Sequence, residues 1–186
     1  MVIVIEGLDG VGKSSVATRL VKMLGPGAQL HYSLPEKMRE SRADFDAMDE
    51  IEKRQFYLLG NCVAVAEANA EYNVLDRSYA STLAYHRGTN VAQGLGDYEH
   101  STSLMWPPHL KPHHYFYLSC EESVRLVRLS GRKTTELTEE EIRLAASDKM
   151  RNEIDWTYRN LEGVEVVDVT HLSQDAAAEA LLLRIL

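Results

Sequence analysis

The sequence predicts an α/β fold in which helices cover both faces of a parallel sheet. Short apolar segments rich in β-branched and aromatic residues alternate along the chain with segments whose apolar residues recur at helical spacing. The first of them, residues 2–6 (VIVIE), leads through a glycine-rich stretch into a helical pattern, as a buried strand followed by its crossover helix would. In such a sheet, ligands bind at the carboxyl ends of the strands.

The individual elements are predicted from the apolar pattern and from the turn residues that bound it. The predicted strands are residues 2–6, 28–33, 73–76, 114–118 and 164–169. The first predicted helix starts at residue 14 and ends before the Gly-Pro-Gly at 25–27. The other predicted helices are residues 49–71, 81–86, 121–129, 138–161 and 175–186. Residues 88–112 contain three glycines and three prolines, and we expect a long loop there. Loops of this length in a compact domain are often functional.

Two of the predicted helices have further features. The 49–71 helix is long enough to cross the domain, and part of it is available to face another subunit. Its apolar stripe is expected to consist of Phe56, Leu59, Val63, Ala66 and Ala70. Thr138 and Glu141 have the spacing of a capping box, which would begin the 138–161 helix.

Length and composition indicate a single domain, residues 1–186, in which 45% of residues are hydrophobic and 26% charged. The net charge of −8, with no run of five basic residues, argues against nucleic acid or an anionic membrane as partner and favours small molecules. Cys62 and Cys120 are far apart in sequence and are expected to be free thiols. No apolar run approaches the ~18 residues of a membrane span, and a strand from residue 2 leaves no room for a targeting peptide, so we expect a cytoplasmic protein.

Residues 7–14 (GLDGVGKS) fit the phosphate-binding pattern G-x-x-x-x-G-K-[ST] at every fixed position. Glycines allow backbone N–H groups to surround phosphate oxygens, and the following helix directs its positive dipole end at the same anion. Lys13 is expected to approach the β- and γ-phosphates, and the Ser14 hydroxyl to ligate Mg²⁺. The expected ATP-binding residues of this loop are Gly7, Gly10, Val11, Gly12, Lys13, Ser14 and Ser15.

A second anion site is predicted at the end of the 73–76 strand, across the sheet edge from Lys13. Arg77 at that position can hold an acceptor phosphate in a two-pronged contact. Asp76 is expected to orient Arg77 or to hold water on Mg²⁺. An acceptor monophosphate, with a second pKa of about 6, is largely dianionic at neutral pH, so the transfer needs no general base.

A basic flap is predicted at about residues 130–138, where Gly131 interrupts the helical pattern. Arg132 and Lys133 lie within this break and Arg128 just before it, as expected of cations that close over ATP. The N-K-x-D motif that reads guanine is absent from the chain, which argues against a GTPase.

Residues 5–15 (IEGLDGVGKSS) together with residues 76–85 (DRSYASTLAY) resemble the thymidylate kinase family, including its offshoot, the mitochondrial type of UMP–CMP kinase. The resemblance covers nearly the whole chain. It implies a P-loop NTPase-type sheet, ATP as co-substrate, Mg²⁺, and transfer of the γ-phosphoryl group to a pyrimidine nucleoside monophosphate, with dTMP to dTDP as the first expectation. It also implies a homodimer that uses part of the 49–71 helix.

The resemblance further implies roles for individual residues. Asp9 would bond the 3′-hydroxyl of the acceptor sugar, and Tyr85 would pack under the sugar and favour deoxyribose. Lys37 falls where the family has an arginine on the acceptor phosphate. Arg39 and Arg42 either assist the acceptor site or are ordinary surface arginines. The expected catalytic residues are Lys13, Arg77, Arg132 and Asp9; the acceptor-binding residues are Asp9, Lys37, Leu58, Asn61, Arg77, Ser81 and Tyr85; Arg128 and Arg132 complete the ATP site, and Ser14 and Asp76 the metal site.

Three departures from the family pattern leave the acceptor base open. Ser78 replaces the tyrosine of D-R-Y, Leu58 replaces a phenylalanine that stacks on thymine, and Cys62 replaces an arginine that reaches the base. UMP, CMP or dUMP therefore remain alternatives to dTMP. From other classes, the chain could be an ATP-binding regulatory module without turnover, or a nucleoside kinase with Glu36 as its general base.

Overall fold

The computed structural model describes residues 1–95, 104–131 and 139–186, and in them it places five parallel strands in one sheet. The strands are β1 (Val2–Glu6), β2 (Ala28–Tyr32), β3 (Tyr72–Asp76), β4 (His114–Ser119) and β5 (Val164–Asp168). Their order in the sheet is β2-β3-β1-β4-β5, so the phosphate-loop strand β1 is central and β3 is its direct neighbour. The predicted α/β fold with a parallel sheet is confirmed.

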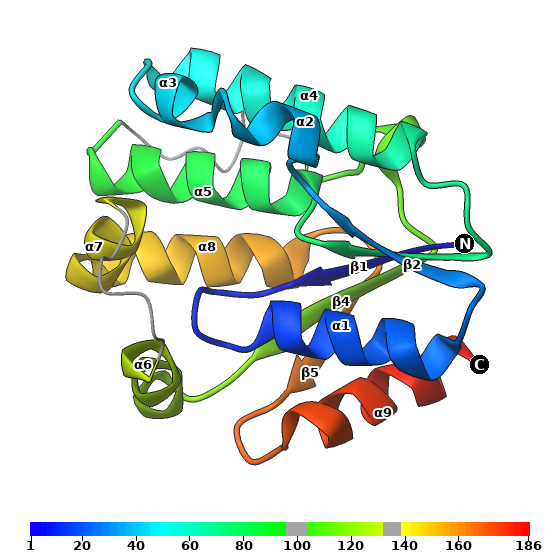
Figure 1. Cartoon of the computed structure of the whole chain (residues 1–186). Helices are drawn as coiled ribbons and strands as arrows, with labels where there is room; N and C mark the ends of the chain where they lie inside the picture. Colours follow the sequence, from blue (N-terminus) through cyan, green and yellow to red (C-terminus); the bar gives the residue numbers. More distant parts are fainter. Residues whose placement is uncertain (96–103, 132–138) are drawn as a thin grey trace.

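Helices cover both faces of this sheet (Figure 1). The helices are α1 (Lys13–Leu24), α2 (Glu36–Arg39), α3 (Arg42–Asp46), α4 (Glu50–Ala66), α5 (Tyr79–Ala92), α6 (Glu122–Ser130), α7 (Glu139–Ala146), α8 (Asp148–Asn160) and α9 (Gln174–Ile185), with a 3₁₀ turn at Pro108–Leu110. Helices α1 and α9 pack on one face, and α5 and α8 on the other, with α4 outside α5. In the described residues, no helix has the length and apolar character that crossing a membrane requires.

The two cores follow from the period of two along β1. Ile3 and Ile5 point into the core under α1 and α9, whereas Val4 points into the core under α5 and α8. Glu6 continues the second set, so its carboxyl group is carried under the start of α5. This placement makes the charged end of the strand part of the interior, and Glu6 is fully buried.

Helix α4 differs from its prediction in both length and orientation. It ends at Ala66 rather than residue 71, and its buried positions are Phe56, Gly60, Asn61 and Ala64. Leu59, which the predicted stripe placed inside, is 57% exposed. The physical reason lies at Gly60, where a Cβ would come within 2.9 Å of the Ser33 carbonyl oxygen, so the glycine lets the chain after β2 pack directly on the helix.

Two other predictions about helices were wrong. Helix α5 runs through residues 88–92, where we expected a loop, because Gly88 packs closely against Ile154 of α8. The 138–161 segment is two helices, since Ser147 leaves the helical conformation and caps α8 by accepting a hydrogen bond from the Met150 amide at 3.2 Å. Residues 96–103 and the expected Thr138–Glu141 capping box lie outside the described residues and side chains.

Candidate functional site

A cavity of about 1000 Å³ opens at the carboxyl ends of the strands. The glycine loop after β1 lines it, together with Ser33 after β2, Arg77 after β3 and Val169 after β5. The two predicted anion sites therefore share one cavity, as the strand order requires.

The backbone of the glycine loop is held close to α6. Gly10 has a φ of 93°, and a Cβ there would lie 2.9 Å from the carbonyl oxygen of Arg125. Both observations require glycine at this position. The ammonium of Lys13 points back along the loop and donates to the Leu8 carbonyl at 3.1 Å.

Three charged side chains that line the cavity form a row. Asp9 lies between Lys13, whose Nζ is 3.6 Å from Asp9 Oδ1, and Arg77, which forms an ion pair with the same oxygen. Tyr85 donates to the other oxygen, Asp9 Oδ2, at 3.0 Å. This arrangement joins the loop after β1 to the start of α5.

The same arrangement shifts the pKa values of its members. Burial alone would raise the pKa of Asp9, but Arg77, Lys13 and the Tyr85 hydroxyl outweigh it and lower the pKa well below its usual range. Burial and the nearby Arg77 guanidinium lower the pKa of Lys13 to about 8, against the opposing effect of Asp9. Burial alone would lower the pKa of Arg77, but nearby groups, chiefly Asp9, outweigh it and raise the pKa well above its usual value.

Arg77 occupies an unusual backbone conformation. Its φ is 69°, and it is the one non-glycine residue with a positive φ in the described chain. Its amide donates to the Ile5 carbonyl at 3.2 Å, and its Nη1 donates to Ser81 Oγ at 3.1 Å. The guanidinium also lies over the Tyr85 ring, with 5.3 Å between its carbon and the ring centre. Such conformations persist only where surrounding contacts fix them, which makes the direction of this side chain a built feature.

Sequence reasoning missed Glu6, whose buried carboxylate binds the residues that follow Arg77 and so holds the turn after β3 in place. One carboxylate oxygen accepts from the amide and hydroxyl of Ser78, at 2.7 and 2.9 Å, and from the amide of Ser81 at 3.2 Å. The other accepts from Ser81 Oγ at 2.7 Å. Burial raises the pKa of Glu6, partly offset by Arg77 and the serine hydroxyls. The serine that departs from the family pattern, Ser78, thus belongs to a buried hydrogen-bond network that ends on the Arg77 turn.

Two arginines of α6 support the glycine loop from its other side. Arg125 is buried, donates from Nη1 to the Asp9 carbonyl at 2.6 Å, and pairs with Glu122. No role for it was predicted. Arg128 lines the cavity, as an ATP-binding residue would, but its guanidinium is bound to the carbonyls of Val11, at 3.1 Å, and Val169, at 2.8 Å.

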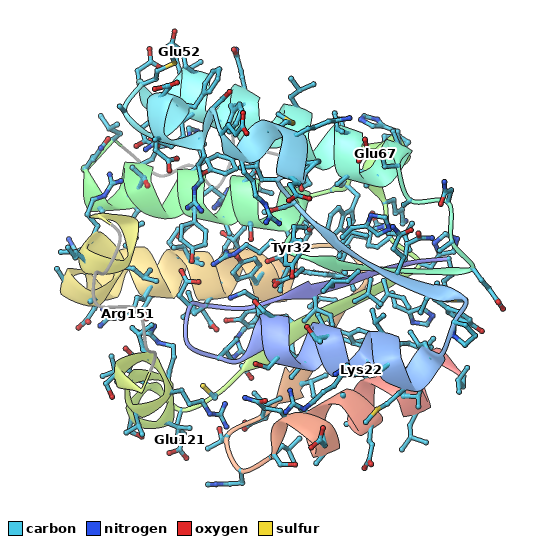
Figure 2. All side chains as sticks on the ribbon, in the orientation of Figure 1. Lys22, Tyr32, Glu52, Glu67, Glu121 and Arg151 are labelled. Carbon is cyan, nitrogen blue, oxygen red and sulfur yellow. The ribbon has the colours of Figure 1, made fainter. Side chains whose placement is uncertain are left out.

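The other predicted residues are divided between the cavity and its surroundings. Ser14, Ser15, Asp76 and Ser81 line it. Outside the lining are Leu58, Asn61 and Lys37; the last pairs with Glu67 at 2.5 Å, and Figure 2 shows Glu67 at the edge of the molecule. Arg39, Arg42 and Tyr57 line the cavity. Arg132 and Lys133 are outside the described residues.

Mg²⁺ fits the oxygen groups at the loop end. Ser14 is exposed to the cavity, and the Asp76 carboxylate lines it without accepting a hydrogen bond from any described side chain. No group of three metal-ligating residues occurs in the described chain. One hydroxyl and one carboxylate, completed by phosphate oxygens and water, match the way proteins hold Mg²⁺ with a bound nucleotide.

The cavity concentrates positive charge in a chain whose net charge is −8. Of the described residues that line it, three are acidic and eight basic, namely Asp9, Glu50 and Asp76 against Lys13, Arg39, Arg42, Lys53, Arg54, Arg77, Arg128 and Arg143. A cleft with this excess attracts ligands that carry several negative charges.

Comparisons with known proteins agree with this geometry. The family model for thymidylate kinase matches residues 5–179. The human protein named UMP-CMP kinase 2, mitochondrial, is 34% identical in an alignment of 178 residues that covers 91% of this chain and 39% of that protein. The chain thus spans about two fifths of the length of this relative.

Solved structures share the fold at lower identity. Thymidylate kinase from Candida albicans is 18% identical, with a TM-score of 0.70 over 99% of this chain and 90% of that one. Deoxyadenosine kinase from M. mycoides with bound dATP is 18% identical, with a TM-score of 0.67 over 100% of this chain and 99% of that one. The chain therefore shares the fold of these two kinases.

Proposed function

The chain belongs to the thymidylate kinase family of nucleoside monophosphate kinases, and we propose that it transfers the γ-phosphoryl group of ATP to a pyrimidine nucleoside monophosphate in the presence of Mg²⁺. The observation that carries the proposal is the row Lys13–Asp9–Arg77, which holds two cations on opposite sides of one carboxylate in the wall of one cavity. Phosphoryl transfer requires two phosphates in line, and this spacing of cations would hold both.

In the proposed reaction the glycine loop and Lys13 bind the β- and γ-phosphates, and Arg77 binds the acceptor phosphate. Bound Mg²⁺ would neutralise charge on the phosphates, with Ser14 and Asp76 as its protein contacts. The cations are fixed before substrate binds, since Asp9 and Ser81 already hold the Arg77 guanidinium. Preorganised charge of this kind lowers the barrier without reorganisation during the reaction.

A monophosphate acceptor fits the site better than a nucleoside does. A nucleoside hydroxyl needs a general base near the reacting oxygen. Glu36, the candidate for that role, is exposed and is not part of the cavity lining. In contrast, the turn after β3 presents a half-buried guanidinium to the cavity, a group suited to a phosphate dianion.

For the acceptor itself we propose a deoxynucleotide, with dTMP first. Support comes from Tyr85, whose ring lies under Arg77 and whose hydroxyl bonds Asp9, where a sugar joined to the bound phosphate would lie. The second candidate is UMP or CMP, favoured by the name of the human relative that is 34% identical. Either assignment keeps the same phosphate contacts.

We also propose that two copies associate through α4. Ile51 and Leu59 of this helix are 65% and 57% exposed. Large apolar side chains left exposed on one helix are typical of a surface that a second copy covers. Light scattering after size exclusion should give twice the mass of the chain. A Leu59→Glu variant should shift the protein toward monomer.

The function is tested by measuring ADP release with dTMP, dUMP, UMP, CMP, AMP and GMP as acceptors. We expect pyrimidine nucleotides to be used well above purine nucleotides, and dTMP above UMP. Lys13→Ala serves as the inactive control for contaminating kinases. Equal use of AMP would overturn the acceptor proposal, and ATP binding without turnover on any acceptor would favour the regulatory module instead.

A further inference from the structure

Arg54 is a basic residue of the cavity wall that belongs to neither of the two proposed phosphate sites. It lies on the cavity-facing side of α4, where Glu50, Lys53 and Tyr57 share its face at helical spacing. Among the described residues it makes no hydrogen bond or ion pair, whereas each of the other seven basic lining residues makes at least one.

That Arg54 has no partner within residues 1–95, 104–131 and 139–186 is notable because Glu50 is four residues before it. A glutamate at this spacing is the favourable partner for a basic residue on a helix. Here Glu50 pairs instead with Lys53, at 3.2 Å, and with Arg143, at 3.8 Å. Arg54 is thus half-buried beside an open cavity, and no residue in the described part of the chain accepts a hydrogen bond from its guanidinium.

The direction of the helices places Arg54 at the end of the cavity far from the phosphates. Helices α4 and α5 run antiparallel (Figure 1), and Asn61 of α4 bonds Thr82 near the start of α5 at 3.1 Å. Arg54 is seven residues before Asn61, which is about 10 Å along the helix axis. It accordingly faces the later part of α5, and burial together with the Arg54 charge lowers the pKa of His86 there.

An acceptor nucleotide would run along the same wall. With its phosphate on Arg77 and its sugar beside Asp9 and Tyr85, its base extends toward His86 and Arg54. Because the single phosphate of the acceptor is already on Arg77, Arg54 cannot contact a phosphate of this nucleotide. What a pyrimidine base offers a guanidinium is a carbonyl oxygen, and a guanidinium can only donate hydrogen bonds.

We propose that Arg54 is a specificity-determining residue that donates to a carbonyl oxygen of the acceptor base. This assignment rests on the proposed function. Cys62, the position at which the family has its base-reading arginine, is not part of the cavity lining, and its sulfur lies 3.8 Å from His109 Nε2. The base contact would then come from two turns earlier on the same helix.

The test is equilibrium binding of dTMP, dUMP, dCMP and base-free 2-deoxyribose 5-phosphate by titration calorimetry, which does not depend on turnover. Arg54→Met should weaken dTMP and dUMP about 10- to 150-fold, the range for a hydrogen bond to a charged group. Base-free sugar phosphate should bind the variant as it binds the unmodified chain. A matched loss for dCMP would place the contact at the 2-oxygen, and its absence at the 4-oxygen; both support the assignment.

Lys53→Met is the matched control, because it removes an adjacent positive charge that is already paired. It should change dTMP affinity less than about twofold. The assignment of Arg54 is overturned if Arg54→Met leaves all affinities unchanged, weakens the base-free sugar phosphate equally, or has no greater effect than Lys53→Met. Failure of the proposed function would appear elsewhere, as binding of these nucleotides without ADP release on any of them.

Discussion

Asp9→Asn removes the carboxylate that lies between Lys13 and Arg77, and its effect should appear in the pH dependence of ATP binding. In the proposed reaction Lys13 binds phosphate as an ammonium, and its pKa in the free protein is about 8. Above that pH, ATP binding must first take up a proton. For the unmodified chain, affinity should therefore be level just below pH 8 and fall about tenfold per pH unit above it.

The size of the shift follows from the 3.6 Å between Lys13 Nζ and Asp9 Oδ1. Two unit charges at this separation interact by about 5 kcal/mol at an effective dielectric constant of about 20, which corresponds to roughly three pKa units. Without Asp9, burial and Arg77 both continue to lower the pKa of Lys13. We expect the midpoint to fall by at least about one unit, and ATP affinity at pH 8 by about fivefold or more.

The assay is a titration with ATP in the absence of any acceptor, repeated from about pH 6.5 to about pH 9. Tyr85→Phe is the control, because it removes a hydrogen bond to the other oxygen of Asp9 and leaves the Lys13–Asp9 pair intact. Its midpoint should stay with that of the unmodified chain. A midpoint for Asp9→Asn at or above the unmodified value would refute the role given to this carboxylate.

Three further predictions test the site and its support. Lys13→Ala and Arg77→Ala should each lower turnover about 10²- to 10³-fold, but only Lys13→Ala should abolish ATP binding measured without acceptor; loss of ATP binding in both would contradict two separate anion sites. Arg125→Met leaves a carbonyl of the glycine loop without its charged donor and should cost about 2 kcal/mol of unfolding free energy in urea, and an unchanged midpoint would rule out this support. Gly88→Ala should destabilise by about 1–3 kcal/mol despite its better helix propensity, since the new Cβ would lie 2.7 Å from Ile154 Cγ1; a higher melting temperature would contradict this packing.

The parts of the site that could be predicted are those that local sequence decides. The glycine loop is recognisable because its glycines, Lys13 and Ser14 lie within eight consecutive residues. Arg77 is recognisable because it directly follows an apolar strand, and strand ends meet at one edge of a parallel sheet. Neither inference needs a contact between distant segments.

The parts that could not be predicted depend on such contacts. Glu6 looks like an ordinary polar strand end, but its partners Ser78 and Ser81 are 72 and 75 residues away. Arg125, three residues after Glu122, has the spacing of an exposed helical ion pair, and only the packing of α6 on the glycine loop buries it. Helix orientation is similarly decided by packing, as Leu59 demonstrates.

The pairing of β1 with β3 links all of these features. In this parallel ladder Ile5 is opposite Asp76, so the next residues, Glu6 at the end of β1 and Arg77 after β3, lie side by side. A slip of one residue would exchange the faces on which their side chains lie. Glu6 would then leave the interior under α5, and Arg77 would lose the turn that directs it to Asp9. The separation of the two cations proposed to bind phosphate is thus set by strand register, which is fixed by the apolar residues that alternate between the two cores.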